Sequence, residues 1–140
     1  MLVAVISDTH LPRGARRLPD ACVERVAAAE LLLHAGDFST LDVLRELEAI
    51  GPPVAAVRGN VDSAELRRLL PEERVVEAAG ARIALIHDAG PRRGRLERMR
   101  RRFGDADLVG RSTSRPRTAS RSSTPAAPPS AAGPRPTRWG

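Results

Sequence analysis

Side chains of the kinds that bind metal ions follow several short apolar runs of the sequence. The set comprises two carboxylates, one amide and two imidazoles, from Asp8, His10, Asp37, Asn60 and His87. Each has an ordinary explanation when taken alone, because Asp, Asn and Gly are common in turns and a histidine beside an apolar run is usually structural. Turn chemistry does not explain two histidines at the ends of apolar runs. The set as a whole therefore predicts a metal site.

The types of these side chains indicate which metals the site would bind. Imidazole nitrogens mixed with carboxylate and amide oxygens suit Mn, Fe, Zn or Co better than Ca or Mg. We therefore expect divalent transition metals, with manganese as the first candidate and Fe, Zn, Co or Ni as alternatives. The five residues come from four separate segments, so the fold must bring these segments together.

Three further groups of residues have simpler explanations. Arg58 lies beside the turn of Asn60 and could meet a substrate phosphate, although an exposed arginine is about as common there. His34 lies inside an apolar run and is expected to face the core. Residues 92–102 hold seven arginines, which we interpret as the solvated face of a helix, with a nucleic-acid contact as the minority alternative. Only Arg58 is kept, as a candidate substrate-binding residue.

The apolar runs predict strands whose ends could carry the site. Residues 2–6, 31–35 and 54–57 have the length and composition of buried strands, and residues 74–77 and 82–87 predict a hairpin. A last strand is expected over 106–109. The predicted helices open at Asp20, at Ser39 or Thr40 and at Ser63, and an arginine-rich fourth helix spans residues 93–103.

Strands that alternate with helices predict an α/β fold with mostly parallel pairing, to which the hairpin adds antiparallel strands. In open sheets of this kind, ligands bind at the edge formed by the C-terminal ends of the strands. The metal-binding side chains follow the strands at that edge. The order of elements therefore agrees with the predicted site.

The charge of the chain is divided unevenly along its 140 residues. Residues 1–110 hold 17 arginines and 17 acids, whereas residues 111–140 hold six arginines, no acid and none of Val, Leu, Ile, Met or Phe. Such a segment cannot bury enough apolar surface to offset its ordering entropy. We expect a domain over 1–110 and a disordered tail over 111–140. The net charge of +6 then reflects a codon bias toward G and C, or alternatively an affinity of the tail for nucleic acid.

Cysteine content and hydropathy indicate where in the cell the protein would be found. The single Cys22 cannot form an internal disulfide, which is typical of a reducing cytoplasm. No apolar run has the length of a membrane span, and residues 1–7 do not have the pattern of a signal peptide. We expect a cytoplasmic protein without membrane contact.

The motifs together resemble those of a known family. In order and spacing, they resemble the calcineurin-like metallophosphoesterases, and most closely their small single-domain bacterial phosphodiesterase branch. The motifs are Asp8-Thr9-His10, Gly36-Asp37, Gly59-Asn60-Val61-Asp62 and His87. The resemblance covers residues 1–110. It implies a four-layer αββα sandwich, in which two facing sheets are flanked by helices.

The resemblance also implies roles for the residues. Asp8 and His10 would bind one metal ion, Asn60 and His87 a second, and Asp37 would bridge both. Two such ions can activate a hydroxide that attacks phosphorus. The implied function is metal-dependent hydrolysis of a small phosphodiester substrate, with nucleic acid not expected as a partner.

The chain departs from the family at two places. Val61 stands where many relatives have a histidine that protonates the leaving group. The family's Gly-His-x-His motif corresponds here to Gly110-Arg111-Ser112-Thr113, so each metal would lose one histidine ligand. We therefore expect a C-terminally incomplete domain with weak metal binding and little activity.

The genetic code suggests a cause for the second departure. If one base were missing near Ser112, the codon of Thr113 would permit His in the original frame. In the same frame, residues 118–120 permit Asp-Gly-Leu and residues 124–129 permit Asn-Pro-Gly-Ser-Pro-Thr, a string similar to one that follows Gly-His-x-His in the family. The hypothesis is that residues 113–140 are an out-of-frame translation. Arg111 precedes the shift and needs a separate change.

Two other classes of function stay open. The domain could be a non-catalytic binding module, or the arginine tail could bind nucleic acid, with an affinity that falls steeply as salt rises. No feature of residues 1–110 indicates either function, so we rank both alternatives below an impaired phosphodiesterase.

Overall fold

The computed structural model describes residues 1–11 and 17–112, which form two small sheets with helices on their outer faces. The first sheet contains β1 (Val3–Ile6), β2 (Leu31–His34) and β3 (Val54–Ala56), and the second contains β4 (Glu73–Ala78), β5 (Ala81–Ile86) and β6 (Leu108–Arg111). The helices are α1 (Asp20–Ala27), α2 (Leu41–Glu48), α3 (Ala64–Leu69) and α4 (Arg95–Arg102).

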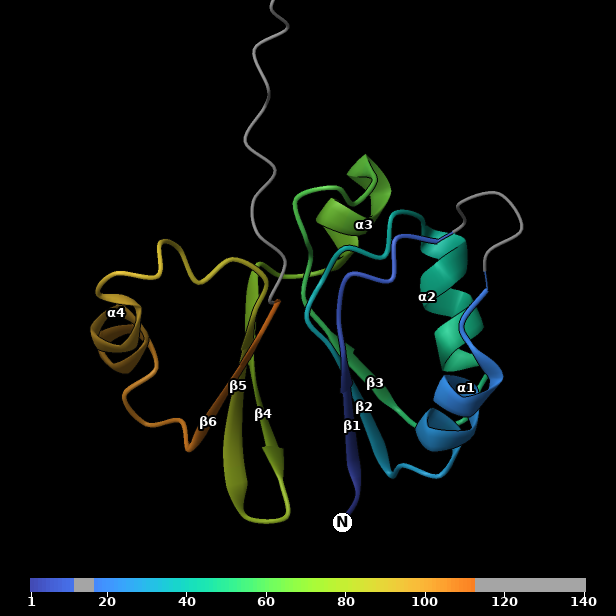
Figure 1. The fold of residues 1–140 in the computed structure, drawn as a ribbon, viewed down its shortest axis with the longest axis horizontal. Helices are drawn as coiled ribbons and strands as arrows, with labels where there is room; N and C mark the ends of the chain where they lie inside the picture. The colour runs from blue at the N-terminus through green and yellow to red at the C-terminus, as the bar shows by residue number, and fades with distance from the viewer. Residues whose placement is uncertain (12–16, 113–140) are drawn as a thin grey trace, which may run out of the picture.

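The first sheet is parallel, and its strands end at the same level. Ile6 of β1 is paired with His34 of β2, which is paired in turn with Ala56 of β3. The loops that leave these three strands therefore begin side by side. The outer face of this sheet packs on α1 and α2 (Figure 1), where α2 buries Val43, Leu44 and Leu47 at helical spacing.

The second sheet combines the predicted hairpin with one parallel strand. β4 and β5 are antiparallel, and β6 runs parallel to β5 with Ile86 opposite Arg111. Its outer face carries α4 (Figure 1), which contributes the buried Met99 to a cluster with Ala84, Ile86 and Phe103. Within the described residues β6 pairs with β5 alone, so its other edge carries no strand from this part of the chain.

The two sheets face each other across a third apolar cluster. Leu33 and Val57 from the first sheet meet Ile83 and Leu85 from the second. The layers are therefore helix, sheet, sheet and helix, which confirms the predicted αββα sandwich (Figure 1). His87 follows a strand of the second sheet, so the site is not built along the edge of one sheet as the residue pattern alone suggested.

Several element boundaries differ from the sequence expectation. The last strand begins at Leu108 rather than at residue 106. Asp107 lies just before it and contacts Arg82 of β5: its N–H donates to the Arg82 carbonyl, and its carboxylate, in place of a backbone carbonyl, accepts the Arg82 N–H. The fourth helix begins at Arg95 because Gly94, with φ 68°, takes the left-handed conformation. Ser63 caps α3 as predicted, accepting the Leu66 N–H.

The arginine run of residues 92–102 is only partly a solvated helix face. Arg95 donates through two nitrogens to the Gly90 carbonyl, and Arg98 donates to the carbonyls of Ala89 and Arg93. These bonds tie α4 to the loop that follows His87. The interpretation of this run as a solvated helix face therefore does not describe these two side chains, which are half-buried.

No helix among the described residues is long and apolar enough to cross a membrane. The tail was expected to be disordered from residue 111, but Arg111 belongs to β6 and Ser112 follows it in the described structure, so the prediction was wrong for these two residues. The rest of the predicted tail, residues 113–140, lies outside the described residues.

Candidate metal centre

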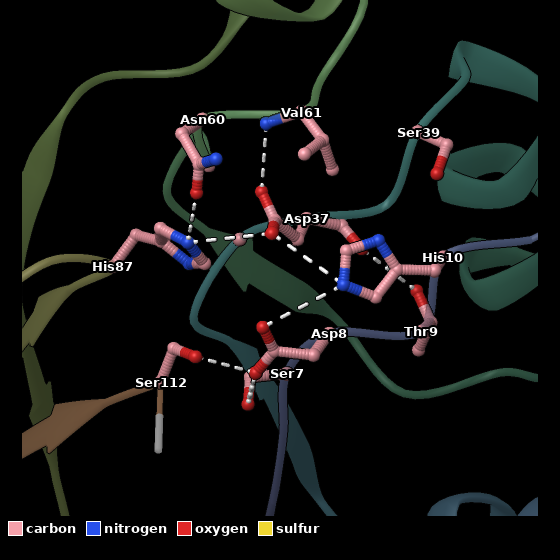
Figure 2. A network of polar contacts seen from close by, with 12 residues as sticks. Ser7, Asp8, Thr9, His10, Asp37, Ser39, Asn60, Val61, His87 and Ser112 are labelled. Atoms are coloured by element: carbon pink, nitrogen blue, oxygen red, sulfur yellow. Dashed lines mark hydrogen bonds and ion pairs between the residues drawn. The ribbon is translucent and has the colours of Figure 1, made fainter. Parts of the chain in front are cut away.

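The structure brings the five predicted ligands together between the ends of the two sheets (Figure 2). Asp8 and His10 lie after β1, Asp37 after β2, Asn60 after β3 and His87 after β5. One ligand atom each from Asp8, Asp37 and His87 lies within 4.8 Å of the other two. His10 and Asn60 join this group through contacts with Asp37 and His87.

Asp37 occupies the centre of the cluster. Its Oδ2 lies 3.5 Å from His10 Nε2 and 3.4 Å from His87 Nε2, while its Oδ1 accepts the Val61 N–H at 3.0 Å. The carboxylate is buried and faces an imidazole on either side (Figure 2). One oxygen of Asp37 therefore lies close to both histidines, as expected for a carboxylate that bridges two cations.

The hydrogen bonds of His87 indicate that a cation fits here. His87 Nδ1 lies 2.7 Å from the Ala35 carbonyl, so this nitrogen carries the hydrogen and donates it. In a neutral imidazole Nε2 then has a lone pair, and it faces Asn60 Oδ1 at 3.0 Å. Two acceptors facing each other are satisfied by a cation between them. Metal-binding histidines commonly donate their other N–H to a backbone carbonyl in this way.

Asp8 accepts hydrogen bonds from the hydroxyl group of its neighbour Ser7 and from that of Ser112, which is 104 positions away. Ser7 Oγ and Ser112 Oγ each donate to Asp8 Oδ2 at 2.5 Å, and Asp8 Oδ1 lies 3.8 Å from His10 Nε2. The carboxylate is thereby turned so that one oxygen faces the cluster (Figure 2). Ser112 is the first residue after β6, and it ties the second sheet to the loop after β1.

The backbone at three of the predicted ligands is in an uncommon conformation. Asp8, His10 and Asp37 have φ values of 57°, 48° and 63°, in the left-handed region that non-glycine residues seldom adopt. Strain of this kind costs about 1–3 kcal/mol per residue and persists where the surroundings hold it, often at functional sites. Its coincidence with the ligand set supports a functional role for these loops.

His34 is not one of the predicted ligands, but it contacts residues next to them. The side chain is fully buried and stacks on Phe38, with 3.6 Å between ring centroids. Its Nδ1 accepts the Gly36 N–H at 3.1 Å, so Nε2 carries the hydrogen and donates to Thr9 Oγ1 at 3.3 Å. The expectation that His34 faces the core is confirmed, and the ring also links the loops that carry Asp8 and Asp37.

Burial lowers the pKa of His34 to about 3, although the negative charges of Asp62 and Asp8 act in the opposite direction. The usual histidine pKa is near 6.5, so between pH 6.5 and 3 the unfolded chain binds a proton that the folded chain excludes. We expect the His34 contribution to the free energy of unfolding to fall with decreasing pH, by up to about 1.4 kcal/mol per pH unit.

Urea denaturation of the wild type and of His34→Gln between pH 7 and pH 4.5 measures this contribution. The difference between the two slopes isolates His34, because their other titrating groups are shared. Parallel stability curves would contradict the assignment.

Other residues near the cluster have different partners. Arg58 pairs with Glu72 at 3.0 Å, so its substrate-binding role stays a prediction. Arg111 Nη1 donates to the Ser112 carbonyl. Thr113, which the resemblance aligns with the second histidine of Gly-His-x-His, lies outside the described residues. Val61 is exposed beside Asp37 and has no group that could donate a proton to a leaving group.

Sequence reasoning assigned no role to Ser112 or Asp62. Asp62 accepts three backbone N–H groups from the loops around the cluster. Its place two residues after Asn60 was the only available signal. Ser112 contacts a residue 104 positions away, and no local pattern reports a contact of that range.

Comparison with known proteins agrees with this geometry. Residues 1–111 match the family model described as the calcineurin-like phosphoesterase superfamily domain. The chain belongs to this superfamily. The predicted superfamily is thereby confirmed. Membership establishes the phosphoesterase fold, and the donor set found here agrees with the divalent metals that such domains hold.

Three known proteins illustrate what the chain is similar to. A probable metallophosphoesterase of Methanothermobacter thermautotrophicus is 40% identical over 71% of this chain and 57% of its own length. Vacuolar protein sorting 29 of Cryptosporidium parvum is 30% identical, with a TM-score of 0.66 over 79% of this chain and 63% of that one. An archaeal phosphodiesterase is 26% identical, with a TM-score of 0.59 over 78% and 70%. The chain thus spans little more than half of the archaeal metallophosphoesterase.

Proposed function

We propose that this domain is built to hydrolyse phosphodiesters with two divalent cations, manganese first among them, held by Asp8, His10, Asp37, Asn60 and His87. The observation that carries the proposal is the position of Asp37, whose Oδ2 lies 3.5 Å from one imidazole and 3.4 Å from the other. This oxygen thus lies between the ligands that follow β1 and those that follow β3 and β5, where a carboxylate could serve two cations.

The residues of the proposed site have different roles. Bound cations would polarise a phosphoryl oxygen and lower the pKa of water. The carboxylates of Asp8 and Asp37 supply negative charge that offsets the repulsion between two cations. The Ala35 carbonyl holds His87 with Nε2 toward the cluster, and Ser7 and Ser112 hold Asp8. Because Val61 carries no proton donor, water would protonate the leaving group.

A diester substrate is supported by one of the relatives. The archaeal structure that is 26% identical is named a phosphodiesterase, and its likeness extends over 78% of this chain. Arg58 lies at the rim beside Gly59, and we include it as a candidate phosphate contact that would have to leave Glu72.

We further propose that activity in this chain is impaired. Arg111 and Thr113 stand where the family has histidines, so each cation would have one protein ligand fewer. The out-of-frame hypothesis for residues 113–140 explains Thr113, and resequencing of the gene tests it: an intact reading frame without the Asn-Pro-Gly-Ser-Pro-Thr string would remove it.

The proposal is tested by hydrolysis of an aryl phosphodiester with added Mn²⁺. The 140-residue chain is compared with a frame-restored chain that also carries Arg111→His. We expect slow turnover by the first and at least a roughly 100-fold faster rate from the second, because two ligands return to the ions. Equal and rapid turnover by both chains would contradict the impairment. A frame-restored chain that binds Mn²⁺ but hydrolyses neither diester nor monoester would contradict the proposed function.

A second candidate is a non-catalytic binding module. The observations that favour it are the absence of a proton donor at Val61 and the likeness to a protein named for vacuolar sorting rather than for hydrolysis. An inert frame-restored chain that is folded and metal-bound is the result expected for this alternative.

A further inference from the structure

Asp62 is a buried carboxylate whose two oxygens are directed at backbone N–H groups. It is 3% exposed. Oδ2 accepts the Gly59 N–H at 2.6 Å and the Asp37 N–H at 3.3 Å, and Oδ1 accepts the Ser39 N–H at 2.9 Å. Two of these donors belong to the loop after β2 and one to the loop after β3. A single side chain therefore binds both loops that carry the centre of the site.

The loop after β2 has the backbone shape that binds anions. Gly36, Asp37 and Ser39 have φ values of 90°, 63° and 91°. A succession of such residues can turn N–H groups toward a common point and form a concave site for negative charge. Here the anion is supplied by the chain itself, as the Asp62 carboxylate. This interaction gives a physical reason why two non-glycine residues keep an unfavourable φ.

The same contacts determine where the Asp37 carboxylate points. The two loops approach so closely that a Cβ on Gly59 would lie 2.0 Å from Asp37 Oδ1. In this arrangement Oδ1 reaches the Val61 N–H and Oδ2 is left facing the two histidines. If the loops separated or the φ of Asp37 changed, Oδ2 would no longer be shared between His10 and His87.

We propose that Asp62 is a positioning residue that holds Asp37 and Asn60 in the geometry required to bind the cations. Both of its oxygens face backbone N–H groups, so the role that we assign to it is to hold the loops and not to bind an ion. This inference rests on the proposed function for the part that concerns cations. Its structural part, the clamping of the two loops, can be measured independently.

The experiment compares the full chain with Asp62→Asn, which keeps the size of the side chain but removes its charge and one acceptor oxygen. Asp107→Asn is the matched control, since Asp107 also accepts a backbone N–H, at 2.7 Å from Arg82, but at the start of β6. Amide hydrogen exchange is followed at Asp37, Ser39 and Gly59, and Mn²⁺ affinity is measured by calorimetry.

For Asp62→Asn we expect exchange at least about 10-fold faster at the three amides, unchanged exchange in β5, and Mn²⁺ affinity lower by ~10–100-fold, the range for residues that orient metal ligands. Asp107→Asn should match the wild type at all three amides and in affinity. Wild-type exchange and affinity in Asp62→Asn would overturn the inference.

Asp62→Glu is a second variant that tests the inference if Asp62→Asn does not fold. The longer side chain retains the charge but displaces the carboxylate, so we expect faster exchange confined to the three amides. Faster exchange throughout the chain would indicate general destabilisation and would overturn the inference. If the wild type bound no Mn²⁺, the proposed function would fail, whereas the exchange data would still decide whether Asp62 holds the loops.

Discussion

Asp37→Ala is expected to lower the affinity of the chain for Mn²⁺ by more than about 100-fold, beyond the ~10–100-fold that the loss of a supporting residue costs. Asp37 is the only one of the five predicted ligands whose oxygen contacts both histidines, at 3.5 and 3.4 Å. Its removal takes charge from both groups of donors at once. It also leaves two imidazoles facing each other without the carboxylate between them.

Calorimetric titration with Mn²⁺ measures this effect in the 140-residue and frame-restored chains. Asp42→Ala is the control, because Asp42 lies on the exposed face of α2 and its ion pair within the described part of the chain is with Arg45, at 3.7 Å. That substitution should leave the affinity unchanged. Unaltered Mn²⁺ uptake by Asp37→Ala would contradict the assignment of the site and the function built on it.

Gly59→Ala is expected to have the largest effect on folding stability, about 3 kcal/mol or more, the upper range for overpacking of a tight site. The added Cβ would lie 2.0 Å from Asp37 Oδ1 and 2.3 Å from the Asp37 backbone nitrogen. The side-chain oxygen could rotate away, but the backbone nitrogen cannot, because its loop is held by Asp62. The two loops would have to separate, and the ligands with them.

Chemical denaturation of Gly59→Ala and of Gly80→Ala separates this overlap from the general cost of adding a methyl group. Gly80 has φ 80° and open space around its Cβ position, so its substitution should cost only about 1 kcal/mol, through backbone strain. Equal losses of stability in the two variants would show that the loops do not meet as closely as the structure places them.

Local patterns in the sequence were sufficient for the elements and for the choice of ligand residues. The apolar runs that end before Asp8, Asp37 and Asn60 are three parallel strands that finish at one level. Continuous apolar residues are typical of strands buried on both faces, and β2 is buried along its whole length. The expectation of a buried strand was only partly right for β1, in which Val5 is 57% exposed. The boundary of the last strand was missed by two residues, since the Asp107 carboxylate accepts the N–H of Arg82, a residue of β5 that lies 25 positions away.

Contacts between loops were beyond prediction from local patterns. His87 was expected at the edge of the same sheet, but it comes from the second sheet and reaches Asp37 across the interface. Ser112 was noted only as the residue between two lost histidines, yet its hydroxyl binds Asp8. The role of Asp62 depends on three N–H groups from two loops. The motif Gly59-Asn60-Val61-Asp62 does not indicate these contacts.

The sequence by itself determined which donor atoms are available, which segments are strands and helices, and that residues 1–110 carry no net charge. These properties follow from residue type and short-range periodicity. The tertiary structure alone decided that one oxygen of Asp37 is shared by two imidazoles and that Asp62 clamps the loops beside it. The physical reason is that hydrogen bonds and ion pairs depend on separations of a few ångströms between segments far apart in the chain, whereas a periodic pattern records only which side of an element is buried.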